Sequence, residues 1–201
     1  MKIAFIRHLR TPGNEKRQYI GRTDESLSDR ALEGFLSRKN RYPAVKSVIA
    51  SPMKRCIETA RLIYPEAEIR TEPLLRECDF GLFEGKTYEE LKNHPAYIEW
   101  LESGGMTAFP EGEPQELFRK RCAEGVQKWI DILLEEKAES AVFVVHGGTI
   151  MASLSRLAEE THDFYHWQVE NGGGYEALVT EREWLNGRKH LKEVRRIHAQ
   201  I

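Results

Sequence analysis

The feature that most restricts the fold of this chain is an apolar run at residues 3–6, which ends abruptly in Arg7 and His8. A fully apolar strand followed by a long crossover is typical of the middle of a parallel sheet, because both faces of such a strand are covered. Open α/β folds bind their ligands at the carboxyl ends of these strands. We therefore expect Arg7 and His8 to lie at the mouth of a binding pocket.

A second apolar run, at residues 48–50, leads into Ser51 and Pro52 and then into an amphipathic helical pattern through Ile63. Proline suits the first turn of a helix, where its missing N–H is not needed, so the pattern predicts Ser51 as the N-cap. Arg55 would then lie in the first turn, near the carboxyl end of the preceding strand.

A third run, at residues 141–145, is followed by His146, Gly147 and Gly148. We expect a helix from about Thr149 to Leu157. Glycines at a strand-to-helix turn let backbone amides approach an anion, and the helix N-terminus favours negative charge there. If the three strands are parallel neighbours, two arginines, two histidines and this turn meet at one place, which is suited to a phosphoryl group.

Five motifs extend the pattern along the chain. They are Arg7-His8-x-x-Thr11-x-x-Asn14, Gly21-Arg22-Thr23-Asp24, Ser51-Pro52-x-x-Arg55, Leu75-x-Glu77-x-x-Phe80-Gly81-x-x-Glu84-Gly85 and His146-Gly147-Gly148. In this order they resemble the histidine phosphatase superfamily, the phosphoglycerate-mutase-like group, and come nearest in appearance to its α-ribazole phosphatase-type members. The resemblance covers residues 2 to about 158.

The expected fold is α/β, a three-layer αβα sandwich with a mostly parallel central sheet in a single domain over residues 1–201. The segment from about residue 72 to residue 114 breaks the alternation of strands and helices, with short helical patterns between glycine and proline turns. An irregular insertion of this length is usually functional, so we predict a small helical lid. Within it, Trp100 and Phe109 are candidates for lining the pocket.

The chemistry of phosphate monoester hydrolysis suggests a role for each residue. Charge in the transition state is concentrated on the equatorial oxygens, so fixed cations should be the largest catalytic contribution. Arg7 and Arg55 would supply permanently charged donors, and His146 with the Gly147 and Gly148 amides would supply further donors. We predict His8 as the nucleophile, a neutral imidazole whose other ring nitrogen is held by a backbone carbonyl. The resemblance implies that Glu77 is the general acid, and then the base. The resemblance also implies that Asn14, Gly21, Arg22 and Gly147 bind the substrate. No metal and no cofactor is expected.

The chain departs from the family pattern directly after the nucleophile. Members usually carry glycine and then an acidic or polar residue, where this chain has Leu9 and Arg10. If that glycine is needed for a positive φ, Leu9 would be strained; if only its carbonyl matters, leucine serves as well. Two alternatives to a phosphatase stay open: a cofactor-dependent phosphoglycerate mutase, whose branch usually has a longer insertion, and a non-catalytic phosphate-binding or scaffold protein.

Composition restricts the partners. A net charge of −2 with interspersed acidic and basic residues gives no argument for nucleic acid or an anionic membrane, and no apolar run approaches membrane-spanning length. Cys56, Cys78 and Cys122 lack metal-ligand spacing, which indicates free thiols in a reducing compartment. With no signal-peptide pattern at residue 1, we expect a cytoplasmic protein that binds a small phosphorylated metabolite. A homodimer is compatible with the sequence, which does not fix the oligomeric state.

Periodicity and turn residues predict the remaining elements. They are a helix Asp29–Lys39 capped by Ser28 with Leu32, Phe35 and Leu36 as its apolar stripe, a short strand Glu68–Arg70, a helix Gln115–Glu136 with Leu117, Val126, Trp129, Ile130 and Leu133 on one face, a flexible turn at residues 171–174, and final strands Tyr175–Thr180 and Leu191–Ile197 joined by a hairpin turn at Asn186-Gly187.

Overall fold

The centre of the molecule is a six-stranded sheet in the order β3-β2-β4-β1-β5-β6. The computed structural model describes residues 1–37, 42–105 and 107–198. The strands are β1 (Lys2–Arg7), β2 (Ser47–Ala50), β3 (Ile69–Thr71), β4 (Ser140–Val145), β5 (Gly174–Leu178) and β6 (Lys192–Ile197). Strands β1 to β4 pair in parallel, whereas β5 is antiparallel to both β1 and β6. The predicted α/β fold with a mostly parallel sheet is confirmed.

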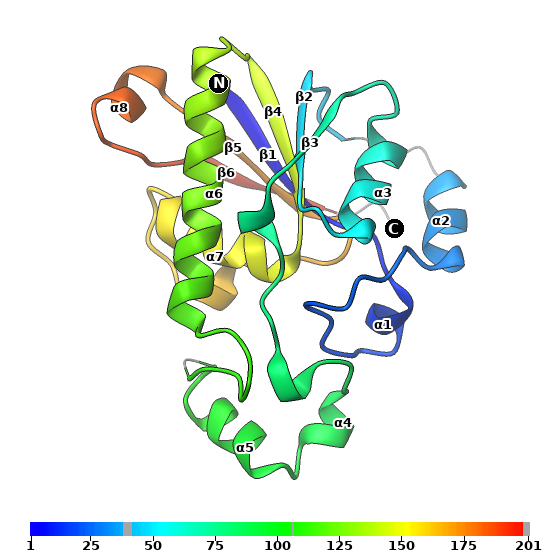
Figure 1. Ribbon diagram of the computed structural model, residues 1–201. Coiled ribbons are helices and arrows are strands. Elements are labelled where there is room, and N and C mark those ends of the chain that lie inside the picture. The colour runs from blue at the N-terminus through cyan, green and yellow to red at the C-terminus, as the bar shows by residue number, and fades with distance from the viewer. Residues whose placement is uncertain (38–41, 106, 199–201) are drawn as a thin grey trace.

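Helices cover the sheet on both faces (Figure 1). They are α1 (Pro12–Glu15), α2 (Asp29–Leu36), α3 (Lys54–Ile63), α4 (Tyr88–Leu91), α5 (Pro95–Glu102), α6 (Gln115–Glu135), α7 (Gly147–Leu157) and α8 (Glu181–Leu185), with short 3-10 turns η1 (Pro73–Leu75), η2 (Gly81–Phe83) and η3 (Phe164–Trp167). The long helix α6 and helix α7 lie on one face of the sheet and α3 lies on the other. Helices α4 and α5 lie away from the sheet, beyond the carboxyl ends of its parallel strands.

The apolar runs in β1 and β4 serve both faces of the sheet at once. Successive side chains of a strand point to opposite faces. In β1, Ile3 and Phe5 belong to the cluster that packs under α6 and α7, and Ala4 and Ile6 belong to the cluster that packs under α3. This is why the runs are apolar without alternation, as expected for strands with two covered faces.

The insertion at residues 72–114 forms a compact apolar cluster of its own with the start of α6. The buried members of this cluster are Cys78, Phe83, Leu91, Tyr97, Trp100, Phe109, Phe118, Cys122 and Ala152. Phe118 and Cys122 belong to α6 and Ala152 to α7, so the insertion is packed onto the helices that cover the sheet. The insertion is therefore held mainly by this apolar packing, together with isolated backbone bridges from Gln18 to Thr87 and from Tyr19 to Glu84.

Three sequence-based predictions of helices need correction. Helix α2 ends at Leu36, and Lys39 lies outside the described residues. Ser28 does cap this helix, but Leu36 is 73% exposed and no residue of α2 is buried. Leu117 of α6 is likewise 57% exposed. A periodic pattern identifies the apolar face of a helix, but it does not show whether another element covers that face.

The predicted hairpin between the last two strands is also wrong. Strands β5 and β6 pair antiparallel as expected, but helix α8 lies between them in the chain. Asn186 is the C-cap of α8, and Gly187 follows it with a φ of 86°. An Asn-Gly pair satisfies a helix C-terminus as well as a two-residue hairpin, because both need a residue in the left-handed region.

Candidate active site

His8 follows the last residue of β1 and is held at three points of its main chain and ring. Its amide donates to the Val145 carbonyl at 2.9 Å, and its own carbonyl accepts from Asn171 Nδ2 at 3.0 Å. The ring atom Nδ1 lies 2.6 Å from the Leu9 carbonyl oxygen. Because a carbonyl only accepts, Nδ1 carries the proton and Nε2 keeps a free lone pair. The predicted backbone partner of the nucleophile is therefore the carbonyl of Leu9.

Leu9 adopts this position without backbone strain. It is not among the described non-glycine residues with positive φ, which are Arg17, Glu111, Lys137 and Glu193. The Leu9 amide donates to Thr59 Oγ1 at 3.0 Å, and its side chain is buried. Of the two roles considered for the usual glycine, only the carbonyl is needed here, and leucine supplies it.

His146 lies directly behind His8, with the two rings 5.2 Å apart and nearly edge-to-face. Arg55 Nε donates to His146 Nδ1 at 3.2 Å. Since a guanidinium cannot accept, the proton of a neutral His146 is on Nε2, which donates to Ser51 Oγ at 2.8 Å. This tautomer is fixed from both sides.

The position of Ser51 corrects a prediction. Helix α3 begins at Lys54 with Met53 as its N-cap, two residues later than expected, and Met53 makes no side-chain cap. Ser51 is fully buried at the end of β2 and binds His146 instead of capping the helix. A serine before a helix has two possible partners, and the chain pattern alone does not distinguish them.

Both histidines lie in surroundings that disfavour protonation. Burial lowers the pKa of His8 well below its ordinary value, and the charges of Arg55 and Arg7 lower it further. Burial, followed by the charge of Arg55, does the same to the pKa of His146. Each imidazole is therefore neutral near pH 7, which is the form of His8 that can attack an electrophile.

Arg55 is fully buried beneath the loop at residues 21–23. Its Nη2 donates to the Gly21 carbonyl at 2.8 Å and its Nη1 to the Thr23 carbonyl at 2.6 Å. The same loop is held from the other side by Glu84, whose Oε1 accepts from the amides of Gly21 and Thr23, both at 2.9 Å. Glu84, which comes from the insertion, is thus connected through the main chain of Gly21 and Thr23 to Arg55.

Arg7 is anchored by the segment that precedes β5. Its Nη1 donates to the Val169 carbonyl at 2.7 Å, and its main chain bonds to Gly172 and Gly173. Its Nε has no partner among the described residues. The side chain of Asn171 joins the His8 carbonyl to Asn14 Oδ1. The turn predicted to be flexible is therefore part of the frame that holds the end of β1.

Glu77 lies at the N-terminus of α7. Its Oε2 accepts from the Gly148 amide at 3.0 Å and its Oε1 from the Cys78 amide at 2.9 Å. Burial raises the pKa of this carboxyl, and the two amide hydrogen bonds and the charges of Arg55 and Arg7 oppose the rise. A raised pKa suits a group that must be protonated when it meets the substrate.

The two glycines after His146 allow side chains to approach the backbone. Helix α7 starts at Gly147, two residues before the predicted start. A Cβ at Gly148 would lie 2.2 Å from Glu77 Oε1, and one at Gly147 would lie 3.2 Å from Arg7 Nε. The Gly148 amide, expected to face a phosphate, here binds Glu77. The glycines therefore make room for the acid and the arginine.

A cavity of about 310 Å³ opens where these groups meet. Of the predicted site residues, the structure brings five to its wall: Arg7, His8, Asn14, Glu77 and Gly147. Three others, Arg55, His146 and Gly21, are buried and do not line it. Arg22 lies outside, exposed, and pairs with Asp79 at 3.5 Å.

The rest of the cavity wall is largely aromatic. Its aromatic members are Tyr19, Phe80, Trp100, Phe109, Phe118, Phe164 and Tyr165. Trp100 and Phe109 thus lie where the sequence placed them, and Gln18, Gln115 and Gln168 add neutral polar groups. A group attached to a phosphate at His8 would rest against flat, mostly uncharged surfaces.

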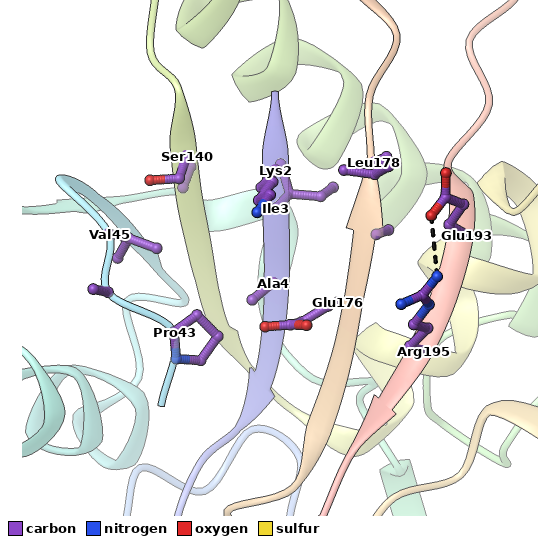
Figure 2. A pocket seen from close by; sticks show the side chains of 13 residues that line it. Lys2, Ile3, Ala4, Pro43, Val45, Ser140, Glu176, Leu178, Glu193 and Arg195 are labelled. Atoms are coloured by element: carbon purple, nitrogen blue, oxygen red, sulfur yellow. Dashed lines mark hydrogen bonds and ion pairs between the residues drawn. The ribbon is translucent and has the colours of Figure 1, made fainter. Parts of the chain in front are cut away.

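A second hollow of the same volume, about 310 Å³, lies at the opposite end of β1 (Figure 2). It is lined by Lys2, Ala4 and residues of the neighbouring strands, with Arg195 paired to Glu193 on β6. No histidine lines it. The amino ends of parallel strands are not where open α/β folds bind ligands, so the candidate site is the one at His8.

Metal clusters and membrane-spanning helices are both absent from the described residues. No group of three or more His, Cys, Asp or Glu side chains in the described ranges is placed to hold a metal ion. No helix within residues 1–37, 42–105 and 107–198 has the length and apolarity that crossing a membrane requires.

Comparison with known proteins agrees with this geometry. A family model described as histidine phosphatase superfamily (branch 1) matches residues 3–192. A broad-specificity phosphatase of Saccharomyces cerevisiae is 26% identical over 180 residues, which cover 85% of this chain and 76% of that protein. A metal-independent phosphoserine phosphatase of Arabidopsis thaliana is 24% identical over 79% of this chain and 69% of its own.

The fold is also that of a solved structure. The α-ribazole phosphatase of Shigella flexneri superposes with a TM-score of 0.77 over 98% of this chain and 96% of that chain, at 22% sequence identity. At this identity the similarity shows the fold alone.

Proposed function

The chain belongs to the histidine phosphatase superfamily, and we propose that it is a metal-independent phosphatase that hydrolyses a small phosphorylated metabolite through a phosphohistidine on His8. The observation that carries the proposal is the 2.6 Å contact between His8 Nδ1 and the Leu9 carbonyl. It fixes the tautomer in which Nε2 is a nucleophile, in a residue that lines a cavity beside Arg7 and Glu77.

In the first step, Nε2 of neutral His8 attacks the phosphorus in line with the leaving oxygen. A P–N bond forms as the P–O bond to the leaving group breaks, and protonated Glu77 gives its proton to the departing alkoxide. The lowered pKa of His8 keeps its lone pair available, and the raised pKa of Glu77 favours the acid form. The imidazole becomes positively charged, and the Leu9 carbonyl stabilises its Nδ1–H.

Charge on the transferring phosphoryl group would be stabilised by cations that are already in place. Arg7 lines the cavity and has an Nε without a partner among the described residues. Arg55 and His146 lie behind His8, and we propose that Arg55 acts at short range through its charge and by holding His146. Cations fixed before the reaction need no reorganisation, which is the source of their catalytic effect.

In the second step, water attacks the phosphohistidine from the side that the leaving group has left. Glu77, now ionised, takes a proton from that water, the P–N bond breaks, and His8 returns to its neutral form. Asn14 and Gly147, on the cavity wall, are proposed to contact the phosphoryl group, and Gly21 to act through Arg55. For Arg22 we propose a contact only with the outer part of a substrate.

The state of the cysteines bears on the cellular compartment of the protein. Cys56, Cys78 and Cys122 are free and buried, as expected for a protein of a reducing compartment. We therefore propose that the phosphatase acts in the cytoplasm.

The experiment that tests the function is hydrolysis of p-nitrophenyl phosphate after exhaustive treatment with EDTA, with acid-labile phosphate on the protein measured by rapid quench. We expect turnover unchanged by the chelator and a labelled intermediate that is lost in His8→Ala. Loss of activity in EDTA, restored by a divalent ion, would contradict the metal-independent reaction. No turnover on a broad panel of phosphomonoesters would favour the non-catalytic alternative, and transfer of the label to a phosphoglycerate faster than to water would favour a mutase.

A further inference from the structure

Arg10 lies two residues beyond His8 and takes no part in the proposed reaction. Its carbonyl accepts from the Ser28 amide at 3.0 Å, and Thr11, the next residue, caps α1, so the main chain around Arg10 is fixed on both sides. Its guanidinium is exposed and makes no hydrogen bond or ion pair with any described residue. A fixed main chain therefore presents an unpaired cation two residues from the proposed nucleophile.

Arg10 lines a separate cavity of about 530 Å³, which Arg7 also lines. The residues that line this cavity are Arg7, Arg10, Tyr165, His166, Gln168, Val169, Glu170, Asn171 and Arg196. Three of them, Arg7, Tyr165 and Gln168, also line the active-site cavity. The two cavities therefore share a wall, and Arg7 faces both.

The charges around the second cavity are not balanced. Among the described residues that line it, Glu170 is the one acidic residue, and it is bound to Arg196 at 2.7 Å. Three arginines, Arg7, Arg10 and Arg196, therefore face one carboxylate in that lining. Burial lowers the pKa of Arg7 and the charge of Arg10 lowers it further, whereas Glu77 and Glu170 raise it. Two like charges kept this close repel each other, and an anion between them would remove the repulsion.

We propose that this cavity, which we name the Arg10 subsite, binds a second anionic group of the substrate, a carboxylate or a second phosphate. The inference rests on the proposed function, because it takes the first phosphoryl group to lie at His8. The substrate would then be a phosphomonoester whose leaving half carries anionic oxygens. Arg7 would contact the phosphoryl group from one side, and Arg10 would bind the second anion beyond Arg7.

The test uses a pair of ligands that differ by one carboxylate and cannot be hydrolysed. Benzylphosphonate and its carboxybenzyl isomers are titrated by calorimetry against the wild-type protein, Arg10→Gln and Arg182→Gln. Arg182 is an exposed arginine of α8, so its variant removes the same charge without touching either cavity. We expect at least one carboxylated isomer to bind the wild type about tenfold more tightly than benzylphosphonate. Arg10→Gln should remove that advantage, and Arg182→Gln should keep it within about twofold.

A ratio of affinities separates the subsite from general electrostatics. If Arg10→Gln weakens both ligands equally, or if the carboxylate gives no advantage to the wild type, the Arg10 subsite is ruled out. Addition of free benzoate is the remaining arm: if it strengthens binding of plain benzylphosphonate in an Arg10-dependent way, the anion need not belong to the substrate and the proposal is wrong in that respect. Because no turnover is measured, an advantage lost in Arg10→Gln supports the subsite even if the protein fails to hydrolyse p-nitrophenyl phosphate, which would reject only the phosphatase.

Discussion

The end of the sheet that carries His8 and the insertion that carries Glu77 supply opposite halves of one site, and they are built in different ways. On the sheet side, His8 and His146 each follow the last residue of a strand, and β1 and β4 are paired along their length. On the insertion side, Glu77 lies between η1 and η2 with no strand or helix of its own, and side-chain to amide bonds hold it.

This difference teaches which part of the site can adapt. Strand pairing fixes the nucleophile relative to the arginine and the second histidine whatever the substrate is. The insertion positions the acid and forms much of the cavity wall, and it is held by aromatic packing, by isolated backbone bridges and by single hydrogen bonds such as those of Glu84. Elements with few backbone pairings open more easily than a central sheet. We therefore expect changes on the sheet side to abolish the chemistry and changes on the insertion side to alter its rate and selectivity.

The largest effect should come from the sheet side. His8→Ala removes the only atom proposed to form the P–N bond, so turnover of p-nitrophenyl phosphate should fall by at least about 10⁴ and no acid-labile label should form. His190→Ala, at an exposed histidine near the start of β6, is the matched control and should leave both readouts unchanged. Retention of labelling in His8→Ala would show that another residue is the nucleophile. The sheet side would then not carry the chemistry that the contrast with the insertion assigns to it.

On the insertion side, Glu77→Gln should impair one substrate class more than another. The amide keeps the shape and can still accept from Gly148, but it has no transferable proton. We expect a loss of about 10² to 10⁴ for an alkyl phosphate and a smaller loss for p-nitrophenyl phosphate, whose leaving group needs little protonation. Rapid quench should then show phosphohistidine accumulating from the aryl substrate, because the second step lacks its base.

Equal losses on both substrates, with no trapped intermediate, would take Glu77 out of the acid role. The assignment would then pass to another carboxylate of the insertion, such as Asp79, Glu84 or Glu113. Each of these is engaged: Glu84 accepts from two amides, Glu113 is bound to Arg121 at 2.7 Å, and Asp79 accepts from the Gly81 amide and pairs with Arg22 at 3.5 Å. Asp79 has the longer ion pair, with an exposed arginine, and would be examined first.

The free energy of unfolding should depend on pH with opposite signs for the groups of the sheet side and for Glu77 of the insertion. His8 and His146 have pKa values lowered by burial and by Arg55, so between about pH 6.5 and those lower values the unfolded chain binds more protons. The free energy of unfolding should therefore fall on acidification below about pH 6.5, by up to about 1.4 kcal/mol per pH unit for each histidine. Glu77, with a raised pKa, acts in the opposite sense between that pKa and its ordinary value of 4.5.

Urea unfolding between about pH 7.5 and pH 5 measures this slope. Replacing one buried histidine, as in His146→Gln, should reduce the slope of the unfolding free energy against pH by the contribution of that histidine. His190→Gln should leave the slope unchanged. A slope that is the same in His146→Gln and in the wild type would mean that His146 is not buried as a neutral group in solution.

A smaller effect is expected where the two halves are joined. Glu84→Ala removes the acceptor of the Gly21 and Thr23 amides and so loosens the loop whose carbonyls hold Arg55. We expect kcat to fall about tenfold at nearly constant KM, because Arg55 acts on the transition state. Glu89→Ala, on an exposed face of the same insertion, is the control. An unchanged kcat in Glu84→Ala would show that the sheet side holds Arg55 without help.

The same contrast decides how much could be foreseen from the sequence. Apolar runs that end in Arg7-His8 and in His146 predicted the parallel sheet and the meeting of these residues, because strand periodicity is local in the chain. The bond from the Gly148 amide to Glu77, the link from Ser51 to His146 and the bond from Asn171 to the His8 carbonyl join residues 71 to 163 positions apart. No local pattern encodes such contacts. Glu84 could have been noticed, since it lies within a recognised motif, but its role depends on a loop 61 to 63 residues away.

The smallest effect should come from the position that departs from the family pattern. Leu9 offers only its carbonyl to His8, and its φ is not positive, so glycine at this position would neither relieve strain nor remove the hydrogen bond. Leu9→Gly should therefore change kcat/KM by less than about tenfold, roughly 1.4 kcal/mol, although loss of a buried side chain should lower the free energy of unfolding by about 2 to 5 kcal/mol. Steady-state kinetics at a temperature where both proteins are fully folded, with Leu9→Ala as a control for the lost volume, separates the two effects. A gain in Leu9→Gly much larger than tenfold, and absent from Leu9→Ala, would mean that the native loop holds His8 away from its productive geometry. The catalytic rate would then depend on backbone freedom even on the sheet side of the site.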